Sequence, residues 1–217
     1  MGGSVYFYVM GIINFTTFLV TSFLFIISPG IDTIFVLNKS IAQGKKAGIY
    51  ATLGITTGVL VHTTLAAFGL SLILSQSAMA FSFLKYVGAA YLVYLGISKL
   101  FSKEEILQRD MAILLEPVHK TYLSAVLTNA LNPKVAIFFL AFFPQFIHPA
   151  QIHNALPFVL LGITYALMGL AWFAVLTFFA GSLSGRLKKQ PLFSIWLNKF
   201  SAGVFVLMGI KIAFTKR

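Results

Sequence analysis

Six long apolar stretches run through this chain, separated by short polar connections. A helix needs roughly 20 mostly apolar residues to cross a bilayer, and each stretch reaches that length. The apolar runs are continuous, whereas the strands of a membrane barrel alternate between apolar and polar residues. The pattern therefore predicts an all-α integral membrane protein with six transmembrane helices, at about residues 10–37, 48–75, 80–101, 121–146, 155–181 and 194–214.

The basic residues between these stretches set the expected orientation, because Lys and Arg are enriched in cytoplasmic loops. The connections after the second and fourth stretches, 75–80 and 147–154, contain none. The other connections are therefore expected in the cytoplasm and both termini outside, although the basic tail conflicts with this orientation. The residues that decide it are Lys39, Lys45, Lys46, Lys99, Lys103, Arg109, Lys120, Arg186, Lys188 and Lys189, and the tail contains Lys211, Lys216 and Arg217.

Composition narrows the class of protein further. The chain of 217 residues is 59% hydrophobic and only 10% charged, which excludes a disordered chain and a solvated single-core domain. Its 16 Lys and Arg against 5 Asp and Glu give a net charge of +11, but these basic residues lie between apolar runs and form no patch suited to nucleic acid. The absence of cysteine excludes disulfides, thiolate metal sites and thiol redox chemistry.

We expect a single membrane domain over residues 1–217. Residues 1–13 have no basic start and no small-residue cleavage site, so they are expected to begin the first span rather than form a targeting segment. The longest connection, 102–120, contains most of the acidic residues and is expected to be a cytoplasmic loop.

The two halves of the chain contain matching sequences in the same order. The motif LGIT occurs at 53–56 and at 161–164, the pair Gly-Ile at 96–97 and at 209–210, and proline at 29 and at 133. These matches predict a duplication of three helices, with repeat 1 at about 10–101 and repeat 2 at about 121–214. Because three is odd, the second copy would enter the membrane from the opposite side, and such inverted repeats are typical of secondary transporters. A membrane scaffold with duplicated helices is the alternative.

The two matched prolines are expected to break their helices, because proline has no N–H to donate and clashes with the preceding turn. In the membrane, irregular backbone survives only inside protein or beside a water-filled cavity. The half-helices that begin after Pro29 and Pro133 would expose N–H groups and a positive dipole end, which suit a carboxylate. We therefore expect a binding site formed around Pro29, Gly30, Asn132 and Pro133, and simple helix kinks are the alternative.

Three ionisable residues are expected inside the membrane, where such residues are functional candidates. Asp32 is the only acid outside the 102–120 connection and is the candidate proton carrier, with capping of its half-helix as the alternative. Lys134 opposes the dipole of its own half-helix, so we expect it to pair with Asp32 or to hold a substrate carboxylate, with snorkelling as the alternative. His62 is either a proton relay or a hydrogen-bonded packing residue.

The sequence contains no signature of an enzyme. No nucleophile elbow, phosphate-binding loop or dinucleotide fingerprint occurs, and the spacing of the histidines matches no metal site. We therefore expect no catalytic activity, no cofactor and no bound metal.

Three segments of the chain carry a family resemblance. They are residues 28–74, which begin SPGIDTIFVLNKS, residues 85–100 (KYVGAAYLVYLGISKL) and residues 127–147 (LTNALNPKVAIFFLAFFPQFI). In this order they resemble the signatures of the LysE/RhtB family of amino-acid exporters. The family's proline-glycine-proline-acid element falls on residues 29–32, where Ile31 replaces the second proline and makes the break milder. Asn132, Pro133 and Lys134 match its later element.

The resemblance implies a small carrier of the bacterial inner membrane that exports amino acids and is driven by the proton gradient. The sequence is more similar to the branch for neutral and hydroxy amino acids, such as threonine, homoserine and leucine, than to the lysine and arginine branch. The implied partners are the amino-acid substrate, protons and the lipid bilayer, and a homo-oligomer is left open. The alternatives are a carrier for another cargo, either a divalent cation or an organic metabolite, and a non-transport membrane scaffold.

Overall fold

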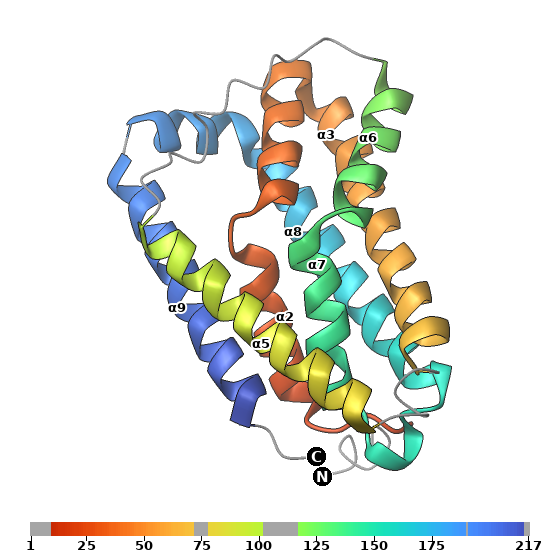
Figure 1. Ribbon diagram of the computed structural model, residues 1–217. Coiled ribbons are helices and arrows are strands. Elements are labelled where there is room, and N and C mark those ends of the chain that lie inside the picture. Colours follow the sequence, from red (N-terminus) through yellow and green to blue (C-terminus); the bar gives the residue numbers. More distant parts are fainter. Residues whose placement is uncertain (1–9, 72–77, 102–116, 190, 215–217) are drawn as a thin grey trace.

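The computed structural model describes residues 10–71, 78–101, 117–189 and 191–214 (Figure 1). Within these ranges the chain is helical and forms no strand beyond one isolated bridge between Ile12 and Ile147. The expectation of an all-α protein is thus confirmed for the described part of the chain. The acidic residues of the 102–120 connection, which are Glu104, Glu105, Asp110 and Glu116, lie outside the described residues.

The first helix breaks where the sequence predicts a break. Helix α2 (Phe15–Ile27) ends before Pro29, and α3 (Ile31–Leu65) begins after Gly30. Both Ser28 and Gly30 have extended backbone, with φ −64° and ψ 116° at Ser28 and φ −153° and ψ −170° at Gly30. The chain therefore unwinds at this point instead of bending as one continuous helix.

Helix α3 reverses direction at Gly44, whose backbone has φ 80° and ψ 178°. The hydroxyls of Ser40 and Thr52 both lie beside the hydroxyl of Thr177, at 3.5 and 3.2 Å. Twelve residues of straight helix would separate them by about 18 Å along its axis. Residues 31–43 and 45–65 therefore form the two arms of a hairpin, which Figure 1 shows rising to the top of the molecule and descending again.

A second break divides the next half of the chain. Helix α6 (Val118–Ala130) ends just before Asn132, and α7 (Pro133–Ile137) starts at the matched proline. The segment that starts at Pro133 is bent by 46° from α6. The remaining described elements are η1 (Ala66–Leu70), α5 (Ala78–Phe101), η2 (Phe138–Phe142), η3 (Phe143–Phe146), η4 (Pro149–Gln151), α8 (Ala155–Lys189) and α9 (Pro191–Phe214).

Several helices run past the limits expected from the sequence. Helix α8 continues to Lys189 instead of ending near 181, and α6 begins at Val118 instead of 121. The apolar pattern marks only the part of a helix suited to lipid, and a helix can continue into water beyond it. Residues 10–14 are not helical, and α2 begins after Asn14, which is in the left-handed conformation.

Apolar helices of membrane-spanning character are present among the described residues. By length and composition, Ile31–Leu70, which includes the reversal at Gly44, and Ala155–Ala180 qualify as candidate spanning segments. Val118–Ala130 with Pro133–Phe146 adds a third if the bent pair is one span. Large apolar side chains also point outward, such as Phe68, Phe179 and Leu207, which are 68%, 62% and 70% exposed. An outer surface of this kind suits contact with lipid.

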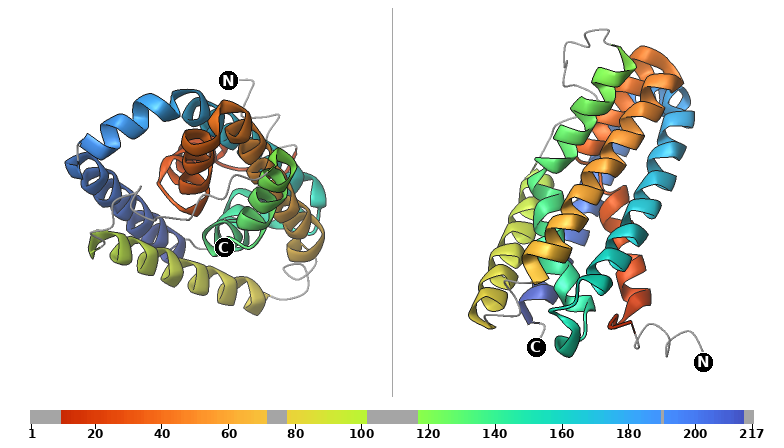
Figure 2. Two further views of the ribbon diagram at one scale, coloured as in Figure 1. Left: turned by 90° about the horizontal axis from the view of Figure 1, so that it is seen from above. Right: turned by 90° about the vertical axis from the view of Figure 1, so that its right-hand side faces the viewer.

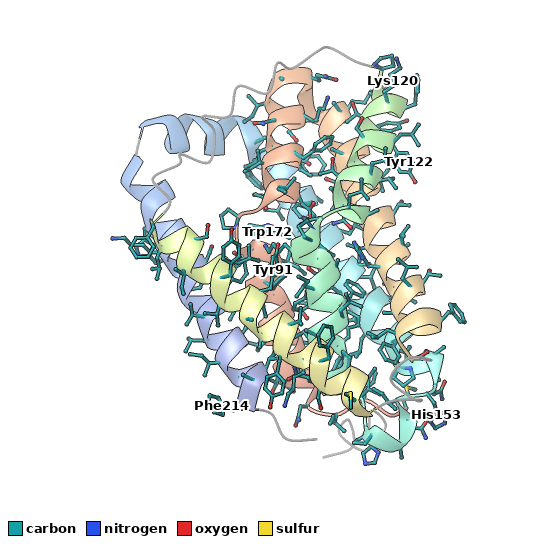
Figure 3. All side chains as sticks on the ribbon, viewed as in Figure 1. Tyr91, Lys120, Tyr122, His153, Trp172 and Phe214 are labelled. Carbon is teal, nitrogen blue, oxygen red and sulfur yellow. The ribbon has the colours of Figure 1, made fainter. Side chains whose placement is uncertain are left out.

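The helices pack in pairs around the broken segments. Seen from above, α5 and α9 lie together on one side of the bundle, and α6 lies against α3 on another (Figure 2). Lys120 and Tyr122 lie near one end of the bundle, and His153 and Phe214 lie near the other (Figure 3). The turn of α3 at Gly44 is at the Lys120 end, which we call the hairpin end.

Two apolar clusters fill the bundle on either side of the breaks. The hairpin cluster lies toward the hairpin end and consists of Phe35, Val36, Leu37, Ala51, Ile55, Ala125, Phe173, Leu176 and Ala180. The phenylalanine cluster lies toward the other end and is built around Phe18, Phe25, Phe138, Phe139, Phe142, Phe143, Phe146, Phe158 and Phe205. The two helix breaks and the polar residues beside them lie between the two clusters.

Candidate functional site

A cavity lies where the two helix breaks come together. The space between its lining side chains amounts to about 440 Å³, part of which is open to the outside. Most of its wall is apolar, and its lining passes from Ile55 and Phe173 of the hairpin cluster to Phe25 of the phenylalanine cluster. Its ionisable and polar members are Asp32, Thr33, Thr56, Asn129, Lys134 and Tyr165.

Asp32 lies in the first turn of the first arm of α3 and reaches across to the second break. One carboxylate oxygen accepts a hydrogen bond from Nδ2 of Asn129 at 2.9 Å, and the other accepts one from Nδ2 of Asn132 at 3.1 Å. A negative charge is also favourable in the first turn of a helix, where free N–H groups gather. Both carboxylate oxygens of Asp32 therefore accept a hydrogen bond from an asparagine side chain beside the second break.

Asn132 connects this acid to the start of α7. Its Oδ1 accepts a hydrogen bond from the backbone N–H of Lys134 at 3.0 Å, which is a helix N-cap. Pro133 occupies the first position of α7, where its missing N–H costs no hydrogen bond. The amide of Asn132 thus caps one half-helix through its oxygen and binds the acid of another through its nitrogen.

Lys134 reaches in the opposite direction, to the first break. Its Nζ donates to the carbonyl oxygens of Phe25 at 3.1 Å and Ser28 at 2.9 Å. The carbonyl end of α2 has negative polarity, so this position suits a cation even though the start of α7 does not. The charge of Lys134 also acts on Asp32, and both residues line the cavity.

His62 lies one step behind the cavity wall. It is buried, its ring stacks on Phe139 at 5.6 Å between centroids, and it is not part of the lining. Its Nε2 lies 3.0 Å from the backbone carbonyl oxygen of Asn129, and because a carbonyl only accepts, the nitrogen donates. His62 therefore holds the end of α6 that presents Asn129 to Asp32.

Asn129 is a site residue that was not among those predicted from the sequence. Its side chain is fully buried, and a Cβ atom on Gly58 would lie 2.7 Å from its Oδ1, so the glycine makes room for the amide between α3 and α6. The available signal was an asparagine inside an apolar span, three residues before Asn132.

The seven residues expected at the site come together in part. Gly30, Asp32 and Lys134 line the cavity, while Pro29, Asn132 and Pro133 form the breaks next to it. His62 lies outside the lining, and its ring nitrogen donates to the backbone carbonyl of Asn129, which binds Asp32 through its side chain.

The chain is similar over most of its length to known membrane proteins. The LysE type translocator family matches residues 23–216. A homoserine/homoserine lactone efflux protein of Salmonella typhimurium is 34% identical over 201 residues, which cover 90% of this chain and 94% of the relative. A leucine efflux protein of Salmonella choleraesuis is 29% identical over 166 residues, covering 76% and 78%.

A further relative is the uncharacterized membrane protein YrhP of Bacillus subtilis, which is 32% identical over 195 residues, covering 86% of this chain and 91% of the relative. No solved structure matches the chain. The family match includes both helix breaks and every residue of the cavity lining named above. The chain is therefore a membrane transporter that belongs to the LysE type translocator family.

Proposed function

We propose that this transporter exports small neutral amino acids or their derivatives, such as threonine, homoserine or leucine, in exchange for protons. The observation that carries this proposal is that Asp32 and Lys134, two opposite charges, face one small and mostly apolar cavity between two helix breaks. The relatives named for homoserine and leucine efflux support the choice of neutral substrates. A basic substrate would need more acid than the one carboxylate of this lining.

The cavity has complementary positions for the two charged groups of an amino acid. The N–H groups at the start of the first arm of α3, beside Gly30, suit the α-carboxylate. Asp32 suits the α-ammonium group, and the apolar wall around Val59 and Phe173 suits an uncharged side chain. A Cβ atom on Gly30 would lie 3.4 Å from the Lys134 side chain, so this lysine lies directly against the first break.

Asp32 is the proposed proton carrier. As a carboxylate it accepts from two amides, and hydrogen bonds to a charged acceptor are roughly twice as strong as neutral ones. Protonation would remove the charge and weaken the hold of Asp32 on Asn129 and Asn132, which flank the second break. Proton binding would in this way favour movement of one half of the bundle against the other.

We also propose that the chain is a single membrane domain of two inverted three-helix repeats, with six spans in all. The contacts between α5 and α9 support this arrangement. A Cβ atom on Gly96 would contact Ala202 and Val206, and one on Gly209 would contact Ala89 and Val93. The residues of each matched pair, Gly96 with Gly209, Ala89 with Ala202 and Val93 with Val206, are equally far apart in the sequence, as a twofold relation between the repeats requires.

The proposed location is the bacterial inner membrane, with the hairpin end in the cytoplasm and both termini outside. Lys39, Lys45 and Lys46 flank the turn at Gly44, and Lys120 lies at the same end. The positive-inside rule supports this orientation.

Efflux from proteoliposomes tests the substrate class. Vesicles containing the purified protein are loaded with labelled homoserine, threonine, leucine, lysine or arginine, and loss of label is followed with the outside more acidic than the inside. The neutral amino acids are expected to leave faster than from protein-free vesicles, and lysine and arginine are not. Efflux of lysine or arginine alone, or of no amino acid, would reject the proposal.

A further inference from the structure

Four of the groups that contact the ammonium group of Lys134 together form a cage around it. Two are the carbonyl oxygens of Phe25 and Ser28, at 3.1 and 2.9 Å. The other two are aromatic faces, with Nζ 4.5 Å from the ring centroid of Phe25 and 5.1 Å from that of Phe205. Both rings are buried, at 1% and 0% exposure. Carbonyl oxygens and aromatic faces together are the groups that recognise ammonium ions.

The cage exists because the helix is broken at proline. In a continuous helix the carbonyl of Phe25 would accept from the N–H four residues later, which belongs to Pro29 and is missing. The carbonyl of Leu24 keeps its helical partner, the N–H of Ser28. Unwinding at Gly30 likewise leaves the carbonyl of Ser28 for another donor. The ammonium of Lys134 therefore replaces backbone donors that the first break removed.

We propose that these four groups form a primary-ammonium binding site, and that Lys134 occupies it as a cation tethered to the other half of the chain. Carbonyls at the unwound ends of half-helices hold the coupling ion in many secondary transporters. Here the chain supplies the cation itself, and transport needs no sodium ion. If the side chain of Lys134 is truncated, the site accepts a free alkylammonium ion instead. This inference rests on the proposed function, because one of the two experiments that test it measures amino-acid transport.

The variant Lys134→Ala tests the site, because it removes three methylene groups and the ammonium, which together have the size of propylammonium. Lys134→Met is the matched control, since its uncharged and unbranched side chain still fills the space. Transport is measured as exchange of labelled amino acid with no imposed pH gradient, because permeant amines collapse such gradients. The sodium salt of the buffer is replaced by choline in a parallel series.

The expected result has three parts. Exchange by both variants falls about tenfold or more, because two charge-assisted hydrogen bonds are lost. Propylammonium restores exchange by Lys134→Ala but not by Lys134→Met, and tetramethylammonium, which cannot donate hydrogen bonds, restores neither. The unmodified protein exchanges equally fast in sodium and in choline.

A second measurement does not depend on transport. Propylammonium is expected to raise the thermal unfolding temperature of purified Lys134→Ala in a saturable way and to leave Lys134→Met and the unmodified protein unchanged. The proposal is overturned if Lys134→Ala exchanges at the unmodified rate, or if propylammonium acts equally on both variants or on neither. Restoration by sodium instead of propylammonium, or sodium dependence of the unmodified protein, would also overturn it. If the unmodified protein exchanges no amino acid, the proposed function fails while the unfolding measurement still tests the site.

Discussion

Asp32 and Lys134 each bond to the helix break in the other half of the chain. The carboxylate of Asp32, which follows the first break, accepts from the side chains of Asn129 and Asn132 at the second. The ammonium of Lys134, which follows the second break, donates to the carbonyls of Phe25 and Ser28 at the first. Each break thus depends on a charge supplied by the opposite half, so a change of charge at either residue affects both halves of the bundle.

Replacing Asn129 by Asp tests whether this amide holds the proton carrier. The change keeps the size of the side chain but replaces the Nδ2 donor with an acceptor beside the carboxylate of Asp32. Exchange of labelled homoserine is expected to fall about tenfold or more, because a charge-assisted hydrogen bond becomes a contact between two acceptors.

Asn154→Asp is the matched control, because Asn154 is exposed and its Oδ1 accepts from the N–H of Leu156 at the start of α8. An acid is favourable at that position, so exchange should be unchanged. Unchanged exchange by the Asn129 variant as well would remove Asn129 from the site.

Two substitutions of His62 separate its alternative roles. Glutamine can still donate to the carbonyl of Asn129 but cannot carry a proton, and leucine can do neither. We expect His62→Gln to keep gradient-driven efflux near the unmodified level and His62→Leu to reduce it, since His62 acts here through the backbone of Asn129. Loss of gradient dependence in His62→Gln, with exchange intact, would instead establish a proton relay.

Gly44→Ala tests the reversal of α3. No atom outside its neighbours in the chain lies within 4 Å of a Cβ at this position, so the cost comes from the backbone, which has φ 80° and ψ 178°. We expect the free energy of unfolding to fall by about 1–3 kcal/mol, because this conformation is almost confined to glycine. Gly203→Ala is the control, since Gly203 also has open space but lies inside helix α9. The free energy of unfolding of this variant should not fall.

Labelling of single introduced cysteines tests the orientation in the membrane. The chain contains no cysteine of its own, so no other residue of the protein reacts with the label. Lys46 and His153 are both exposed and lie toward opposite ends of the bundle. In intact cells a membrane-impermeant maleimide is expected to label His153→Cys and to label Lys46→Cys only after the cells are opened. The reverse pattern would place the hairpin end outside the cell.

The positions of both breaks could be predicted from the sequence, while their contacts could not. Proline removes a backbone donor wherever it occurs, so Pro29 and Pro133 identified where the helices end. The partners of Lys134 depend on how α2 packs beside α7, and no local pattern encodes that packing. The sequence also placed a loop somewhere between 37 and 48, but the helix continues until one glycine reverses it. Asn129 was missed because its role arises only from the approach of α3 to α6.

The variant Asp32→Asn tests whether protonation of Asp32 couples the proton gradient to export. The measurement compares efflux of labelled homoserine under an imposed pH gradient with exchange in its absence, in vesicles containing the unmodified protein, Asp32→Asn or Asp32→Glu. The amide has no charge to gain or lose, so we expect Asp32→Asn to exchange substrate but to show no acceleration by the gradient, whereas Asp32→Glu keeps part of it. If the gradient accelerates efflux by Asp32→Asn as much as efflux by the unmodified protein, Asp32 is not the residue that couples protons to export.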